Sequence, residues 1–356
     1  MHKKLLIPGP TEVSKEILQE QTQYLIGHRE KAFSDLYGGI TDKLSKFFEL
    51  PAEYKPTVTT GSGSLWFDIL GRSVAKEKAL ACVNGAFSER CAQTLAACGK
   101  QTDVFKVEMG QAIKPEDVLE KLAADKYDTL TVCHNETSTG VRSPIAEIGK
   151  RAREEFPEVI FAVDAVSSMA GDKTLPQDFN CDIVFGSTQK CFALPPGLAV
   201  GLVSDRAIER AKAVPNRGAY TDLVDIFEFE KKHQTPFTPN VSLLYALNKR
   251  LDLLLEETYD RVCARHQDMA NYTQTWAKKH FSMFPEAGYE SITVSCINSD
   301  GRDVKALNQK LGERGYLISA GYGKLADKTF RIGHMGEWNL QGIEEVLALI
   351  DEIWEL

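Results

Sequence analysis

Short apolar segments that end in polar residues recur along this chain and alternate with segments of helical periodicity. The clearest are residues 79–83, 130–133, 159–164 and 182–187. Each is too short for a typical helix and apolar on both faces, which is typical of strands buried on both sides. Strands that alternate with helices form a mostly parallel sheet with helices on both faces. The sequence therefore predicts an α/β fold.

A further strand is predicted at residues 198–203, directly after the turn Pro195-Pro196-Gly197. A parallel strand needs a long crossover connection, whereas a short turn suffices for an antiparallel one. We therefore expect this strand to add to the sheet in the antiparallel direction.

Two of these strands deliver chemically useful side chains. Residues 159–164 end in Asp164, and the strand at 182–187 continues through Gln189 to Lys190, which is followed by the apolar residues 191–194. Burial lowers the pKa of a lysine, and a neutral amine can attack a carbonyl. Ligands of open α/β sheets bind beyond the carboxyl ends of the strands. A carboxylate for the ring nitrogen and an amine for the aldehyde are the two groups that pyridoxal phosphate requires. The ordinary alternative is a lysine at the mouth of a loop.

The length of 356 residues exceeds that of a typical single core, so a large and a small domain are expected. We place an N-terminal arm at residues 1–20, a large domain at 21–257 and a small α+β domain at 258–356. A long helix from about residue 241 links the two domains.

Charge and composition exclude several classes of partner. The net charge of −8 argues against nucleic acid and anionic membranes. The first apolar run is too short for a signal peptide and no stretch reaches transmembrane length, so a cytoplasmic protein is expected. The eight cysteines form no CxxC pair and no metal-ligand spacing, so we expect reduced thiols and no metal site.

Other segments offer groups to an anionic or planar ligand. Gly61-Ser62-Gly63-Ser64 joins a strand to a helix and forms either a phosphate cradle or a tight turn. His28 and Arg29 precede a helix predicted at 31–48, where an anion would be favoured, although a surface arginine is more common. Phe87 follows a strand and either stacks on a ring or belongs to the core.

Three further features complete the candidate site. Gly9 lies between two prolines, in a segment that is either a plain arm or a cover over a cleft where the backbone approaches a ligand. Arg331 lies in a strand-like apolar run and needs a carboxylate partner, either structural or from the substrate. Residues 216–239 read as an irregular segment of the kind that carries function or covers an interface.

Taken in order, these motifs resemble those of the class V aminotransferases, pyridoxal phosphate enzymes of fold type I. The resemblance covers nearly the whole chain. It is closest to the branch of alanine–glyoxylate and serine–pyruvate aminotransferases, with phosphoserine aminotransferases nearby. It rests on the segments 8–11, 61–63, 84–87, 136–141, 164–168, 186–190, 195–197, 235–239 and 330–333.

The resemblance implies a role for each candidate residue. Lys190 would bind pyridoxal phosphate covalently and Asp164 would pair with its ring nitrogen. Arg331 would bind the substrate carboxylate, with Gly9, His28 and Arg29 also on the substrate side. Relatives often have His where this chain has Ser64, which is a departure from the family pattern. The remaining cofactor contacts would be Phe87 and Val166 on the ring faces, Thr137 at the ring hydroxyl, and Ser62, Gly63, Ser64 and Gln189 at the phosphate, joined by Thr235 and Thr238 across a homodimer interface.

The implied reaction is ping-pong transamination between a small amino acid, alanine or serine, and a 2-oxo acid such as glyoxylate, pyruvate or 2-oxoglutarate. One alternative is phosphoserine:2-oxoglutarate transamination, with His28 and Arg29 on the substrate phosphate. A lyase such as a cysteine desulfurase is a second alternative, but Gln189 stands where such enzymes usually have His. A third alternative is a regulator that binds the cofactor without catalysis, but the sequence shows no appended DNA-binding segment.

Overall fold

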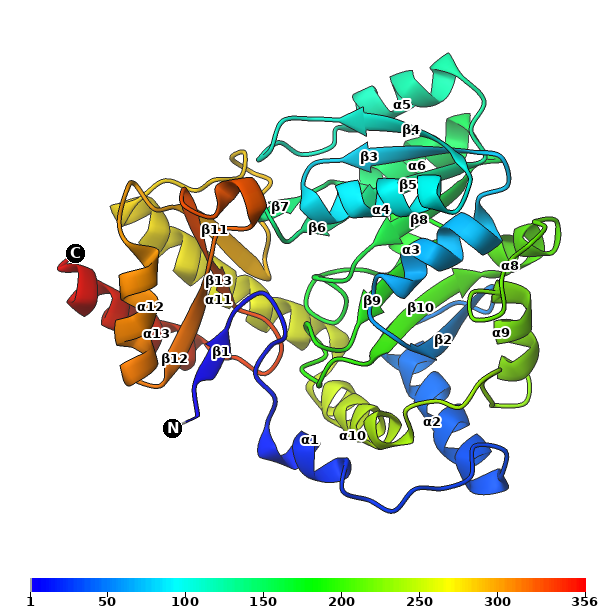
Figure 1. The fold of residues 1–356 in the computed structure, drawn as a ribbon, viewed down its shortest axis with the longest axis horizontal. Coiled ribbons are helices and arrows are strands. Elements are labelled where there is room, and N and C mark those ends of the chain that lie inside the picture. The colour runs from blue at the N-terminus through cyan, green and yellow to red at the C-terminus, as the bar shows by residue number, and fades with distance from the viewer. Residues whose placement is uncertain (1) are drawn as a thin grey trace.

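The computed structural model describes residues 2–356, which contain two larger sheets and a two-stranded one (Figure 1). The larger sheet has seven strands in the order β2-β10-β9-β8-β5-β3-β4. All pairings are parallel except those of β10, which runs antiparallel to both neighbours. The α/β prediction and the antiparallel strand are thereby confirmed. The strands are β2 (Tyr54–Thr60), β3 (Lys78–Val83), β4 (Gln101–Lys106), β5 (Thr129–Cys133), β8 (Ile160–Asp164), β9 (Ile183–Ser187) and β10 (Leu198–Ser204).

Helices cover both faces of this sheet, and the side chains of each strand alternate between two cores. In β3, Leu80 and Cys82 face one core whereas Ala79, Ala81 and Val83 face the other. The first core is covered by α2 (Lys31–Phe47), α5 (Pro115–Ala124), α6 (Ile145–Glu155), α7 (Pro176–Phe179) and α10 (Val241–Glu257). The second is covered by α3 (Leu65–Ile69), η1 (Leu70–Val74), α4 (Ala86–Ala97), α8 (Asp205–Lys212) and α9 (Leu223–Glu230).

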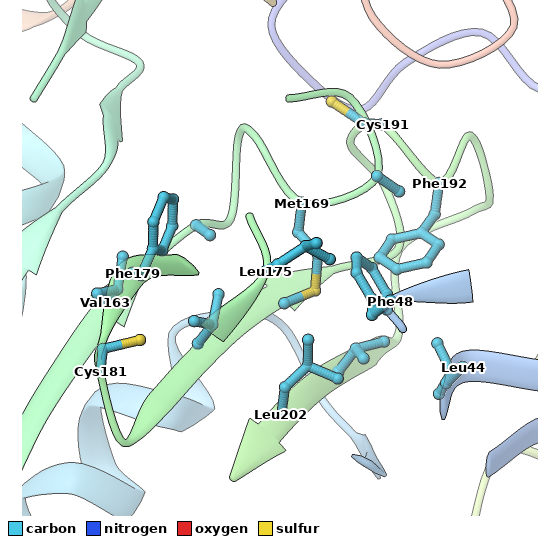
Figure 2. Packing of buried hydrophobic residues seen from close by; sticks show 14 of the residues in the cluster. Leu44, Phe48, Val163, Met169, Leu175, Phe179, Cys181, Cys191, Phe192 and Leu202 are labelled. Carbon is cyan, nitrogen blue, oxygen red and sulfur yellow. The ribbon is translucent and has the colours of Figure 1, made fainter. Parts of the chain in front are cut away.

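The first core also fixes the loop that follows Lys190 (Figure 2). Cys191 and Phe192 are fully buried, and the Phe192 ring lies 6.4 Å from that of Phe48, edge to face. Such aromatic pairs favour this geometry. The backbone at Lys190 is therefore anchored by apolar packing on its carboxyl side.

The smaller sheet has four strands in the order β1-β12-β13-β11. Its first strand, β1 (Lys4–Leu6), comes from the start of the chain and pairs in parallel with β12 (Tyr316–Ala320). This sheet packs with three helices around a third core. The other elements are β11 (Val294–Asn298), β13 (Thr329–Gly333), α11 (Tyr259–His280), α12 (Val304–Glu313), η2 (Gly323–Leu325) and α13 (Leu340–Trp354), with α1 (Lys15–Glu20) against α10.

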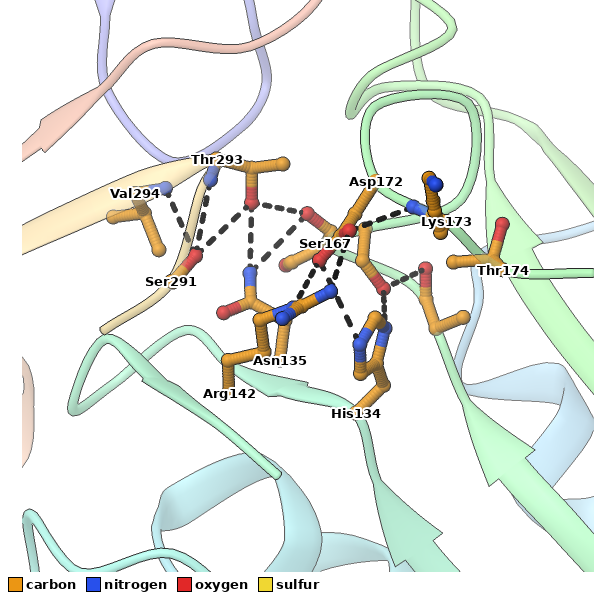
Figure 3. Close-up of polar contacts among 12 residues, drawn as sticks. His134, Asn135, Arg142, Ser167, Asp172, Lys173, Thr174, Ser291, Thr293 and Val294 are labelled. Atoms are coloured by element: carbon orange, nitrogen blue, oxygen red, sulfur yellow. Dashed lines mark hydrogen bonds and ion pairs between the residues drawn. The ribbon is translucent and has the colours of Figure 1, made fainter. Parts of the chain in front are cut away.

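A buried polar network joins the two sheets (Figure 3). Asn135, in the hairpin of β6 (Asn135–Glu136) and β7 (Val141–Arg142), donates to Thr293 Oγ1 at 2.8 Å. Thr293 in turn donates to the carbonyl of Ser167 at 2.6 Å. Arg142 forms a two-point ion pair with the buried Asp172. Because buried polar groups are costly when they are unpaired, these hydrogen bonds fix the position of the segment that leads into β11.

Strand β11 begins only at Val294, because the Ser291 hydroxyl accepts hydrogen bonds from the backbone N–H groups of residues 293 and 294 and holds a turn. One local prediction is wrong. The segment 216–239 is not irregular throughout, since it contains α9. Asp222 caps this helix by accepting from Val224 and Asp225, and the apolar spacing of Leu223, Ile226 and Phe227 was its signal in the sequence.

All eight cysteines are free in the structure, and all but Cys98 are buried. Within residues 2–356, no helix combines the length and apolar character needed to cross a bilayer. The same residues contain no cluster of three or more His, Cys, Asp or Glu side chains arranged to hold a metal ion.

Packing on the second core predicts a severe effect for Gly201→Ala. A Cβ on this β10 residue would lie 1.9 Å from Cζ2 of Trp66, whose indole is fully buried and stacked on Phe185. Overpacking of this kind costs about 1–3 kcal/mol. We expect urea unfolding of the cofactor-free protein to show a loss of this order.

Gly39→Ala in α2 is the matched control, because nothing lies within 4 Å of its Cβ position. Alanine is favoured over glycine in a helix by up to about 1 kcal/mol, so this variant should be unchanged or more stable. Equal stability of the two variants would contradict the packing described for Trp66.

Candidate active site

Asp164 and Lys190 lie at the same edge of the large sheet. β8 and β9 are parallel neighbours with Asp164 in register with Phe185, so their carboxyl ends coincide. Both side chains are more than nine-tenths buried. Burial lowers the pKa of Lys190 to about 8 and raises the pKa of Asp164 to about 7. An amine that is partly neutral near physiological pH therefore lies beside a carboxyl whose charge is costly without a cationic partner.

The N-terminal segment lies across Lys190. The lysine Nζ donates a hydrogen bond to the carbonyl of Pro8, and Thr11 Oγ1 donates to the carbonyl of Lys190 at 3.0 Å. Gly9 has a φ of +104°, and a Cβ there would lie 2.7 Å from the lysine Nζ. Only glycine permits this conformation and this approach. The N-terminal segment is therefore not a plain arm, because its backbone covers Lys190.

The Gly/Ser loop lies against the end of β9. Gly63 donates its N–H to Ser187 Oγ at 3.1 Å, and Ser187 donates to the side chain of Gln189. A Cβ on Gly63 would lie 2.5 Å from Cγ2 of Val166, so no other residue fits. Val166 in turn donates its N–H to Asp164 Oδ1 at 2.9 Å. The loop of Ser62, Gly63 and Ser64, Val166 and Gln189 therefore belong to one site with Asp164.

A residue to which the sequence assigned no role, Glu136, organises the next part of the site. Its carboxylate is fully buried and accepts hydrogen bonds from the N–H groups of Phe87 and Ser88 at the start of α4. It also accepts from the backbone N–H and hydroxyl of Ser138. A carboxylate at a helix N-terminus is favourable because it satisfies unpaired N–H groups. Glu136 thus fixes Phe87, and its place in a polar run after a strand was the available signal.

Arg331 is buried without an acidic partner among the described residues. Its guanidinium donates to the carbonyls of Thr137 and Ala320, each at 3.1 Å. The structural carboxylate that was one of the two predicted partners is therefore absent, and burial lowers the pKa of Arg331. Carbonyl oxygens do not neutralise a guanidinium, so the group still favours an incoming carboxylate. Thr137 bonds through its hydroxyl to Ser167, close to Asp164 in the chain.

The remaining candidates form a separate cluster within this chain. Arg29 donates to the carbonyls of Thr235 and Pro236 at 2.6 and 2.8 Å, and its guanidinium lies over the ring of Phe229. Thr235 and Thr238 line a pocket along β2, the edge strand, which β10 separates from β9. The structure therefore does not bring Arg29, its neighbour His28, Thr235 or Thr238 to Lys190 in a single chain.

The assembled groups define a definite chemistry. Among residues 2–356, a buried amine, a buried carboxyl, a glycine-lined cradle and a guanidinium without an ion-pair partner lie at one edge of the sheet. Such a set can bind an anion, hold a cationic ring nitrogen and move a proton at a carbon beside the amine.

Comparison with known proteins assigns the chain to a family. The family model described as aminotransferase class-V matches residues 5–326. An uncharacterized aminotransferase of Methanocaldococcus jannaschii is 39% identical over 98% of this chain and 91% of its own length. The soluble hydrogenase 42 kDa subunit of Anabaena cylindrica is 29% identical over 98% and 92%, and the serine–glyoxylate aminotransferase of Methylorubrum extorquens is 29% identical over 94% and 87%.

Solved structures agree with this assignment. A phosphoserine aminotransferase of Cytophaga hutchinsonii superposes with a TM-score of 0.90 at 27% identity, over 98% of both chains. The match therefore includes both sheets. The resemblance noted in the sequence is confirmed: the chain belongs to the class V aminotransferases.

Proposed function

We propose that this aminotransferase uses pyridoxal 5′-phosphate to transfer the amino group of a small amino acid, alanine or serine, to a 2-oxo acid. The observation that carries the proposal is the buried pair of Lys190 and Asp164 at adjacent strand ends, together with a buried Arg331 that forms no ion pair within residues 2–356. The serine–glyoxylate relative supports the substrate class.

The residues present fit the proposed cofactor. The Gly63 cradle leaves no room for a Cβ, as expected where backbone must approach a phosphate closely. Burial raises the pKa of Asp164 to about 7, and a protonated ring nitrogen beside it would favour its carboxylate form. Ser62, Ser64, Thr137 and Gln189 would add polar contacts, while Phe87 and Val166 would cover the ring faces. When bound, the cofactor supplies an electron-withdrawing ring conjugated to the substrate nitrogen.

Each of the protein groups around the cofactor has its own role in the proposed reaction. Arg331 binds the substrate carboxylate with two parallel N–H donors and so orients the Cα–H bond. Lys190 Nζ, whose pKa is lowered to about 8, takes the proton from Cα and returns it to the neighbouring carbon. Asp164 holds the proton of the ring nitrogen in place by its negative charge. The segment around Gly9 covers Lys190 and excludes water.

We further propose a homodimer in which Thr235 and Thr238 complete the site of the partner subunit. These residues lie away from Lys190 in their own chain, at the outer edge of the large sheet. Beside them the exposed Tyr220 ring stacks on Phe237 with centroids 4.1 Å apart, which places an exposed aromatic pair next to these threonines. The division at residues 20 and 257 is retained as the proposed domain boundary.

Phosphoserine is the second candidate donor, favoured by the similarity to the Cytophaga hutchinsonii enzyme. In that reaction His28 and Arg29 would bind the substrate phosphate. The Arg29 guanidinium bonds to two carbonyl groups in this chain, as the Arg331 guanidinium does, so these contacts do not decide between the two donors.

Lys190→Ala should abolish transamination, because no other amine lies at this position. Borohydride reduction followed by peptide mass spectrometry should attach the cofactor to Lys190 in the parent protein and to no residue in the variant. Lys173→Ala, which changes an exposed lysine, is the matched control and should retain both properties. Transamination by the Lys190 variant at the parent rate would refute the assignment.

A half-reaction screen tests the substrate class. The cofactor-loaded enzyme is mixed separately with alanine, serine, aspartate, glutamate and phosphoserine, and the decay of the cofactor absorbance is followed. Rapid decay with alanine or serine supports the proposal, whereas decay with phosphoserine and glutamate alone favours the second candidate.

Arg331→Ala should weaken the binding of every donor by about 2–5 kcal/mol, since all donors share the α-carboxylate. A loss confined to one donor would contradict that role.

The raised pKa of Asp164 predicts a pH-dependent stability of the cofactor-free protein. The unfolded chain ionises this carboxyl near pH 4, whereas the folded chain does so near pH 7. Unfolding therefore releases a proton between these values, and the contribution of Asp164 to stability falls as the pH rises through this window. Asp164→Asn removes the effect, so the variant should gain a few kcal/mol over the parent at pH 8 and little at pH 4. Parallel urea-unfolding profiles against pH would exclude this assignment.

A further inference from the structure

A second guanidinium, that of Arg90, contacts the same tyrosine side chain as Arg331. Arg90 follows Phe87 by three residues on α4, so both side chains lie on one face of the helix. The Arg90 Cζ lies 5.2 Å from the centroid of the Phe87 ring. Its Nη2 donates to the hydroxyl of Tyr322 at 3.2 Å. The Tyr322 ring packs against Phe87 with centroids 5.2 Å apart.

Tyr322 connects the two guanidinium groups. The Arg331 Cζ lies 5.5 Å from the centroid of the Tyr322 ring, while Arg90 contacts the hydroxyl of the same side chain. Arg331 is buried and Arg90 is exposed. Arg331 therefore lies at the ring of Tyr322 and Arg90 at its hydroxyl. A ligand that binds Arg331 through one end has the Arg90 guanidinium near its other end.

Arg90 retains binding capacity. Among residues 2–356 it has no ion-pair partner, and the adjacent Glu89 is engaged with Lys106 at 2.7 Å. A guanidinium carries five N–H donors, of which the bond to Tyr322 uses one. The stacking on Phe87 and the bond to Tyr322 hold the group in place, which lowers the entropy cost of binding an anion.

We propose that Arg90, positioned by Tyr322, binds a second anionic group at the side-chain end of the substrate. The enzyme then accepts a dicarboxylic amino acid or 2-oxo acid, such as glutamate or 2-oxoglutarate, in the site that also takes a small amino acid. A phosphate at the end of the side chain offers the same chemistry. The inference rests on the proposed function, in which Arg331 binds the α-carboxylate.

The first experiment measures binding without turnover. The cofactor-loaded enzyme is titrated with glutarate, which carries two carboxylates, and with butyrate, which carries one. Arg90→Gln should weaken glutarate binding about ten- to a hundredfold more than butyrate binding, the size of one lost charge-assisted contact. Equal weakening of both ligands, or of neither, would overturn the proposal.

The second experiment uses half-reactions with glutamate, phosphoserine and alanine. In Arg90→Gln, the ratio of kcat/KM for glutamate to that for alanine should fall about ten- to a hundredfold, mainly through KM. Arg90→Lys should restore part of it, and Tyr322→Phe should lower it severalfold. A fall confined to the phosphoserine ratio would identify phosphate as the anion. Equal losses for all donors would show a structural role and contradict the inference.

Lys324→Gln is the matched control, because it removes an exposed positive charge two residues from Tyr322. This variant should leave the glutamate-to-alanine ratio of kcat/KM unchanged. A loss as large as that of Arg90→Gln would show that only general electrostatics is involved and would overturn the proposal.

If no amino acid changes the cofactor absorbance of the parent protein, the proposed function fails. The comparison of glutarate with butyrate then still decides whether Arg90 binds a second anion.

Discussion

The parallel pairing of β8 with β9 is the constraint on which the site depends. It brings Asp164 and Lys190 to one edge of the sheet and removes both from water. Burial makes each charge costly, which is visible in the opposite shifts of their pKa values. The apolar packing of Phe192 on Phe48 keeps the lysine loop against the sheet. Apolar packing thus offsets the cost of removing these two ionisable groups from water.

The N-terminal segment couples this edge to the small sheet. Pro8 accepts from Lys190, while a Cβ on Gly333 would lie 2.5 Å from the carbonyl of Ile7. Gly333 ends β13, the strand that carries Arg331. The segment that covers the amine therefore packs on the strand that carries the guanidinium. Any shift of the small sheet changes the distance between the two groups, so the polar network around Asn135 and Thr293 is part of the same arrangement.

The sequence was most informative where function depends on local pattern. Buried strands are continuous apolar runs, so their ends at Asp164 and near Lys190 could be located directly. Contacts between distant segments carry no such signal. The bonds from Arg29 to Thr235, the pairing of β1 with β12 and the contact of Arg90 with Tyr322 join residues about 200 or more positions apart. The role of Glu136 was also hidden, because an acidic residue in a loop looks like a solvated one until the fold places a helix N-terminus above it.

Burial of Asp164 lowers the stability of the cofactor-free protein, and binding of a complementary ligand reverses this effect. In the part of the chain that the structure describes, neither Asp164 nor Arg331 forms a hydrogen bond to an oppositely charged group, so folding of the cofactor-free protein includes the cost of their desolvation. A ligand that brings a cationic nitrogen to one and a carboxylate to the other recovers this free energy on binding. By linkage, such a ligand stabilises the folded protein in proportion to the logarithm of its concentration over Kd. The unpaired charges therefore lower the free energy of unfolding of the cofactor-free protein. Binding of the groups that complement them restores it, which favours binding.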